Sequence, residues 1–224
     1  MSVALFSGRF VEVSSARGGG LTLALWLLLQ YQHEGGWVGW AASAEAPFYP
    51  PDMAEAGVDL EHLAVVLCQQ AEQAAQAALR LLQSGAFSLV VLDLGGWSPP
   101  PGLSMALQSR LAALTRKHHS VLLALTHKSP QERSLELVGL RVQGESYEGG
   151  VSLDVLKDKR HGPGARFWLP VRAPDGLYRY PRVSLPVDGR SAARLGSAAA
   201  GPGQELQAHG AIVGGQWPGP GAGV

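Results

Sequence analysis

The feature that most constrains the fold is the stretch from Glu12 to Leu29, EVSSARGGGLTLALWLLL. It is typical of a short strand, a loop of small residues and an apolar helix, and the apolar run is too short to span a bilayer. A phosphate loop has this layout, with the pattern Gly, four residues, Gly-Lys and then Ser or Thr. Gly20 and Thr22 match the last glycine and the hydroxyl. Ser15 replaces the first glycine and Leu21 replaces the lysine, so the frame of a nucleotide site lacks its main positive charge.

Apolar runs and helical repeats alternate along the first 126 residues. The expected strands are 10–13, 37–42, 63–67, 89–93 and 121–126, and the expected helices are 20–30, 52–56, 69–84 and 103–118. Strands that are apolar on both sides and separated by helices predict an α/β fold with a mostly parallel sheet covered by helices. Three later segments, 135–142, 151–156 and 166–169, alternate apolar and polar residues and predict antiparallel strands at the C-terminal edge of that sheet.

Composition divides the chain into a core and a tail. Residues 1–187 have the length and apolar content of one domain, whereas residues 188–224 are dominated by Gly, Pro and Ala and predict a flexible tail. The one cysteine, Cys68, excludes an internal disulfide and indicates a reducing compartment. The first residues lack the features of a secretory leader. A cytoplasmic protein without a membrane partner is therefore expected.

Charge is distributed unevenly, although the net charge is zero. Residues 1–99 hold 3 of the 18 Lys and Arg and 9 of the 18 Asp and Glu, which leaves 15 basic and 9 acidic residues in the second part. This asymmetry favours a contact with DNA or an acidic partner in residues 100–224. A solvated set of surface charges explains it equally well, and both interpretations stay open.

Over roughly residues 8–170, the order of five segments resembles the RecA family. The segments are GRFVEVSSARGGGLTLAL, FYPPDMAEAGVDLEHLAVV, QAAQAALRLLQSGAFSLVVLDLGG, THKSP and SLDVLKDKRHGPG. They are similar to the family's phosphate loop, its Gly-Val-Asp segment, its Walker B strand, the start of a DNA-binding loop and its late hairpin. The resemblance implies a RecA-like three-layer α/β/α core.

Departures from that family carry the functional expectation. The family's lysine is replaced by Leu21, its water-activating acid would fall near Ser43, and its sensor glutamine is replaced by His127. Hydrolysis would lack the groups that stabilise the phosphates and orient water, so no enzymatic activity is expected.

The resemblance also implies which residues would form a vestigial nucleotide site. They are Gly18, Gly19, Gly20, Thr22 and Asp93, the last of which matches the Walker B aspartate. No cofactor is expected, although backbone donors at the loop leave room for weak ATP and Mg²⁺ binding. A strand-end aspartate that caps the following turn is the alternative interpretation of Asp93.

The second half contains the predicted DNA- or partner-binding residues. They are Lys128 and Arg133 in the loop after the fifth strand, and Lys157, Lys159 and Arg160 in the late hairpin. The alternative for the hairpin residues is an ordinary solvated tip.

A RecA-like core with a failed nucleotide site and a basic second half resembles the ImuA family of bacterial mutagenesis accessory proteins. That resemblance implies a nucleoid-associated, non-catalytic adaptor in the SOS response that supports translesion synthesis. Its implied partners are an ImuB-type Y-family polymerase homologue, RecA and an error-prone replicative-type polymerase, with weak DNA binding. We expect the family's N-terminal assembly segment to be missing here, which would argue against autonomous filaments. The alternatives are a SulA-like cell-division inhibitor that binds the division tubulin, and a weak DNA-dependent ATPase.

Overall fold

A computed structural model describes residues 2–45, 48–97, 102–147 and 149–170, without the side chains of residues 16 and 17. The strands are β1 (Phe10–Arg17), β2 (Trp37–Ser43), β3 (Leu63–Cys68), β4 (Phe87–Asp93), β5 (Val121–Thr126), β6 (Leu140–Tyr147), β7 (Gly150–Asp158) and β8 (Arg166–Pro170). The α-helices are α1 (Gly20–His33), α2 (Pro50–Glu55), α3 (Ala71–Ser84) and α4 (Met105–His118), and short 3₁₀ helices are η1 (Val3–Leu5) and η2 (Leu60–His62).

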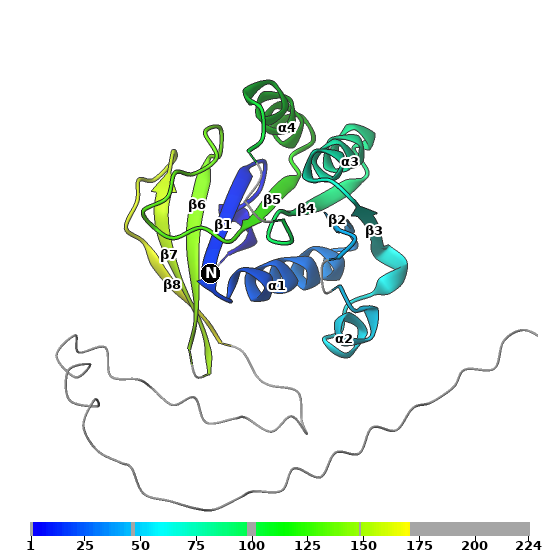
Figure 1. Cartoon of the computed structure of the whole chain (residues 1–224). Coiled ribbons are helices and arrows are strands. Elements are labelled where there is room, and N and C mark those ends of the chain that lie inside the picture. The colour runs from blue at the N-terminus through cyan, green and yellow to red at the C-terminus, as the bar shows by residue number, and fades with distance from the viewer. Residues whose placement is uncertain (1, 46–47, 98–101, 148, 171–224) are drawn as a thin grey trace, which may run out of the picture. The chain divides into compact units, whose positions relative to one another are not determined.

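All the described strands join one sheet in the order β3-β2-β4-β5-β1-β6-β7-β8. The pairings from β3 through to β6 are parallel, and β7 and β8 are added in antiparallel orientation. Helix α1 covers one face of the sheet, and α3 and α4 cover the other (Figure 1). The predicted three-layer α/β fold, mostly parallel with antiparallel strands at its C-terminal edge, is confirmed.

Alternation along β1 supplies both hydrophobic cores. Val11 and Val13 pack toward α1, where Leu23 and Leu27 are fully buried. Phe10 packs on the opposite face, toward α3 and α4. Burial of each such side chain contributes about 1.5–3 kcal/mol, so a central strand apolar on both faces stabilises both halves of the sandwich.

Helix α3 confirms the helix predicted over residues 69–84. Its alanines let it pack closely on the sheet, and Gln70 and Gln73 form a reciprocal capping box at its start. Gly85 ends the helix at a φ of 71°, and a Cβ there would lie 2.9 Å from Nδ1 of His118 at the end of α4. Glycine at this position therefore serves both the turn and the close approach of the two helix ends.

The strand expected over residues 135–142 is wrong in its bounds. β6 begins at Leu140 and continues to Tyr147, five residues beyond the expected end. Leu135 and Val138 are buried, but they lie in the connection before β6 and pack into the core beneath α3 and α4. β6 is also parallel to β1, so only its pairing with β7 is antiparallel. An apolar pattern cannot distinguish burial in a strand from burial in a connecting segment.

Two further expectations concern the C-terminal tail and the membrane. The boundary at residue 187 and the tail at 188–224 lie outside the described residues. None of the helices in the described ranges has the length and hydropathy needed to cross a membrane.

Candidate functional site

The glycine loop is shorter than a phosphate loop. β1 does not end near Val13 but continues to Arg17, which pairs with Glu145 of β6 after a register shift. Only Gly18 and Gly19 therefore separate the strand from α1. In the phosphate-loop pattern, the stretch from the first glycine to the lysine forms the cradle. Here residues 15–17 of that stretch belong to β1, with Arg17 paired to β6 after an irregularity that follows Ser14.

Packing within the protein accounts for the two loop glycines. Gly18 and Gly19 have φ values of 79° and 93°, a region that side-chain-bearing residues rarely adopt. A Cβ on Gly19 would lie 3.0 Å from Cγ1 of Val151 and 3.1 Å from the carbonyl carbon of Gly144. The Ser15 hydroxyl donates to the Gly18 carbonyl oxygen. The loop backbone thus rests directly on β6 and β7.

The first turn of α1 contains no cation. Gly20 is buried, Thr22 is half-buried, and 56% of the Leu21 surface is exposed at the position of the lysine in the phosphate-loop pattern. The N-cap residue, Gly19, makes no side-chain cap. Free N–H groups at a helix start attract anions, but the lysine charge that would hold a β- or γ-phosphate is missing.

Asp93 lies at the end of β4 beside His127, which follows β5. Its Oδ1 accepts a hydrogen bond from the Gly95 N–H at 3.0 Å, so it does cap the following turn. Burial raises the pKa of Asp93, against the opposing effects of that hydrogen bond and of His127. A Cβ on Gly95 would lie 2.9 Å from His127 Nε2 and 3.3 Å from Asp93 Oδ1. The part of the chain that the structure describes contains no group of three or more potential metal ligands.

Sequence reasoning missed a buried polar cluster centred on Glu12. This side chain is fully buried on β1, where it faces the α4 side of the sheet. Its Oε1 accepts from Lys128 Nζ at 3.0 Å and from Thr126 Oγ1 at 3.2 Å, and its Oε2 accepts from the Leu135 N–H at 2.8 Å. The only signal in the sequence is a carboxylate in an otherwise apolar strand.

Arg141 of β6 completes this cluster from the neighbouring strand. Only 5% of its surface is exposed. Its Nε donates to Ser14 Oγ at 3.0 Å, and its terminal nitrogens donate to the carbonyl oxygens of Glu132 at 2.5 Å and Ser129 at 2.8 Å. Glu12 and Arg141 therefore hold the connection between β5 and β6 against the sheet.

Lys128 and Arg133, both predicted to bind DNA or a partner, lie in that connection and differ in availability. The ammonium of Lys128 is bound by Glu12 and by the carbonyl oxygen of Arg133, and 14% of its side chain is exposed. Arg133 has an exposed side chain. The structure thus places Lys128 in the internal cluster and leaves Arg133 accessible to solvent.

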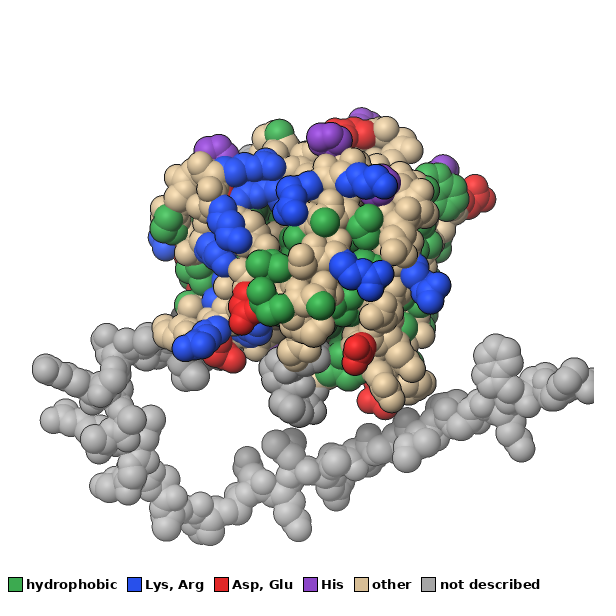
Figure 2. All heavy atoms as spheres, turned by 90° about the horizontal axis from the view of Figure 1, so that it is seen from above, with side chains coloured by type: hydrophobic (Ala, Val, Ile, Leu, Met, Phe, Trp, Pro, Cys, Tyr) green, Lys and Arg blue, Asp and Glu red, His purple; other side chains and the backbone are tan. Residues whose placement is uncertain are grey.

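The three hairpin cations lie near the end of β7. Lys157 is half-buried, its Nζ donates to the Glu136 carbonyl oxygen at 3.4 Å, and burial lowers its pKa. Lys159 and Arg160 are exposed and line a pocket of about 150 Å³ together with Arg116 of α4. Figure 2 shows Lys and Arg side chains gathered on this side of the molecule. Arg116 was not predicted, because its helix is remote from the hairpin in sequence.

A buried ion pair anchors the end of β7, next to the hairpin cations. Asp158 accepts from Arg9 at 2.5 Å, and 3% of each side chain is exposed. Burial alone would raise the pKa of Asp158, but hydrogen bonds from Arg9, the Arg160 N–H and His161 hold it well below its usual range. This pair fixes the start of β1 to the end of β7.

The fold and its strand, glycine loop and helix define the class as a RecA-like α/β protein. A family model described as the MT3502 N-terminal domain matches residues 3–131, more than half of the chain, so the chain belongs to this family. Over 87 residues the chain is 36% identical to Protein RecA of Fusobacterium nucleatum subsp. nucleatum. That stretch is 38% of this chain and 23% of the RecA sequence, so the chain spans less than a quarter of that curated relative.

Proposed function

We propose that this chain is a non-catalytic RecA-like adaptor in the bacterial DNA-damage response. It would support mutagenic translesion synthesis by binding an ImuB-type Y-family polymerase homologue, RecA and an error-prone replicative-type polymerase. The observation that carries the proposal is the glycine loop: β1 pairs with β6 as far as Arg17, and the lysine position holds Leu21. A RecA-like fold whose glycine loop is shortened to two residues and lacks the lysine is better suited to binding a partner than to hydrolysis.

Energetics support the absence of turnover. Phosphoryl transfer depends on positioned positive charge and an oriented water. The first turn of α1 supplies no cation, and burial raises the pKa of Asp93, which disfavours its charged form. Gly18, Gly19, Gly20 and Thr22 could still hold an anion through backbone donors, which is the residual nucleotide binding that the proposal allows.

ATP turnover with and without single-stranded DNA tests the catalytic part. The natural chain and Asp93→Ala should show the same background rate of ATP turnover. RecA serves as the active reference. Turnover that Asp93→Ala abolishes would replace the adaptor by the alternative, a weak DNA-dependent ATPase.

Capture experiments with purified proteins test the partners. The immobilised chain should retain the ImuB-type homologue, RecA and the error-prone polymerase, and should not retain the division tubulin. Retention of the division tubulin alone would favour the SulA-like alternative and contradict the mutagenesis role.

A weak contact with DNA is proposed for the basic group of Lys157, Lys159 and Arg160, and for Arg133, which is exposed in the connection between β5 and β6. Replacing the three hairpin residues by Ala should weaken binding of single-stranded DNA. It should also reduce the slope of log affinity against log salt by about 2, the value for three lost phosphate contacts. Arg80→Ala, an exposed arginine on α3, is the matched control. Equal affinities and slopes for all variants would remove the DNA contact from the proposal.

A further inference from the structure

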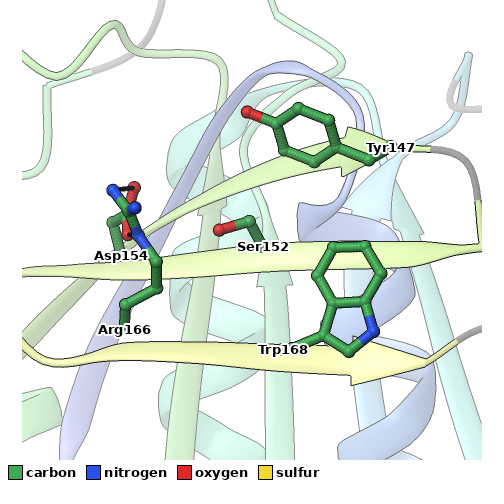
Figure 3. Close-up of a pocket in the computed structure, with 5 residues that line it drawn as sticks. All are labelled: Tyr147, Ser152, Asp154, Arg166 and Trp168. Atoms are coloured by element: carbon green, nitrogen blue, oxygen red, sulfur yellow. Dashed lines mark hydrogen bonds and ion pairs between the residues drawn. The ribbon is translucent and has the colours of Figure 1, made fainter.

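The outer face of β6, β7 and β8 differs from the rest of the sheet. The inward residues of these strands, among them Val142 and Leu153, are buried in the core with α1. The opposite face carries a hollow of about 350 Å³ lined by Tyr147, Ser152, Asp154, Arg166 and Trp168. Figure 3 shows the two aromatic rings toward one end of this hollow and the Arg166–Asp154 pair toward the other. None of the functions considered above uses this surface.

Two large aromatic side chains stand exposed together in the hollow. Tyr147 on β6 is 55% exposed and Trp168 on β8 is 52% exposed. Their ring centroids lie 6.4 Å apart with an interplanar angle of 41°. The small side chain of Ser152 on β7 lies between the two strands and leaves the ring faces open. Clustered exposed aromatics are typical of binding surfaces.

Both rings are held in position before any ligand arrives. A Cβ on Gly150 would lie 2.5 Å from Cζ2 of Trp168, so the indole packs directly on the backbone of β7. The Tyr147 hydroxyl donates to Glu145 Oε2 at 2.8 Å, and this hydrogen bond raises the pKa of Tyr147. A preorganised surface loses less conformational entropy on binding.

The charges around the hollow favour a cationic ligand. Two carboxylates, Glu145 and Asp154, face one guanidinium, Arg166, which is already paired with Asp154. Among the side chains that the structure describes around the hollow, these three charges leave one net negative charge beside two aromatic faces. This combination attracts an arginine or lysine side chain through ion pairing and cation–π contact, and it repels phosphates.

The neighbouring backbone favours an extended ligand. Among the described strands, β8 pairs with β7 alone and forms the edge of the sheet. A peptide added along an edge strand gains main-chain hydrogen bonds and presents alternate side chains to the same face. An arginine on the strand-like peptide would then project toward Trp168.

We propose that this surface, termed the aromatic hollow, binds an extended, arginine- or lysine-bearing peptide segment of a partner protein. This inference rests on the proposed adaptor function and specifies the surface through which one partner docks. Chemistry identifies the partner segment as basic and strand-forming.

The test uses the full chain and a fluorescent peptide of alternating arginine and valine, which places its arginines on one face. Fluorescence anisotropy should show binding of this peptide and not of its glutamate–valine counterpart. Trp168→Ala should weaken binding about 3- to 30-fold, the range from an exposed to a desolvated cation–π contact. Glu145→Gln should weaken it as well, with a larger effect at low salt.

Trp37→Ala is the matched control, because Trp37 is a comparably exposed tryptophan (44%) on β2. The proposal is overturned if Trp37→Ala and Trp168→Ala reduce the affinity for the peptide equally, or if the arginine peptide does not bind to the natural chain. It is also overturned if single-stranded DNA, rather than the peptide, depends on Trp168, which would make the surface a base-stacking platform.

Partner capture separates this inference from the proposed function. Suppose that Trp168→Ala retains the ImuB-type homologue and RecA, and that the natural chain does not bind the peptide. This result refutes peptide binding by the aromatic hollow and leaves the adaptor role standing. Peptide binding that depends on Trp168, without capture of any proposed partner, refutes the adaptor role and leaves the surface standing.

Discussion

Two segments that follow central strands, the glycine loop after β1 and the connection after β5, are held in opposite ways. Gly18 and Gly19 rest on β6 and β7 through close backbone packing, without charge. The connection after β5 is held by buried charges, with Glu12 and Arg141 bound to its main chain. The segment that resembles a nucleotide site thus lacks the lysine charge, whereas the connection after β5 is held by a cluster of buried charges that no sequence motif indicates.

Removal of the Glu12 carboxylate should lower the free energy of unfolding more than any other substitution considered for these two segments. Glu12→Ala leaves Lys128 without its counter-ion and the Leu135 N–H without an acceptor, so the free energy of unfolding should fall by about 3–5 kcal/mol. Urea unfolding measures this change. Glu136→Ala, an exposed acid of the same connection, should change it by less than about 0.5 kcal/mol. A small loss at Glu12 would mean that packing alone holds the connection.

The Arg9–Asp158 pair provides a second buried ion pair for reference. Asp158→Asn should cost about 1.5–3 kcal/mol at neutral pH, the range for hydrogen bonds to charged groups. Because the folded pKa is depressed, this contribution is present above the unfolded pKa near 4 and is lost as the pH falls below it. The stability difference between the natural chain and Asp158→Asn should therefore narrow from pH 5 toward pH 2. A difference that stays constant would contradict a depressed pKa.

The glycine loop should respond to added volume rather than to altered charge. Gly19→Ala places a Cβ at a φ of 93° and against Val151, so it should cost about 1–2 kcal/mol from backbone strain. Thermal unfolding measures the loss, and Gly102→Ala, where a Cβ would meet nothing within 4 Å, is the control. Equal effects at the two positions would show that the loop does not depend on its contact with β6 and β7.

Restoring the missing charge should have the smallest effect. Leu21→Lys changes an exposed side chain and should alter stability by less than about 0.5 kcal/mol. It should not create ATP turnover, because the water-activating acid is missing as well. Appreciable turnover in Leu21→Lys would mean that the loop keeps a working phosphate cradle.

Local patterns predicted much of the fold. β5 has the predicted bounds, and α3 with its Gly85 cap follows from alanine spacing and a left-handed stop. The start of β6 could not be predicted, because Leu135 and Val138 are apolar for packing and not for strand pairing.

The polar cluster escaped prediction for a different reason. Glu12 meets Lys128 across 116 residues and Leu135 across 123, and no local pattern encodes such a pairing. Tyr147 and Trp168 were likewise not singled out: Tyr147 lies beyond the strand expected over residues 135–142, and Trp168 lies within the strand expected over residues 166–169. The predicted nucleotide residues Gly18, Gly19, Gly20, Thr22 and Asp93 remain a prediction, and packing and turn capping account for several of them.

The central position of β1 also bears on how the chain is made. β1 is synthesised before the other described strands, yet its two sheet neighbours, β5 and β6, lie more than a hundred residues later. Until residue 147 has been synthesised, at least one of its edges remains unpaired and open to other chains. Chaperones that shield the nascent chain from aggregation should therefore matter most between the emergence of β1 and that of β6. A truncated chain that ends before residue 140 is expected to aggregate.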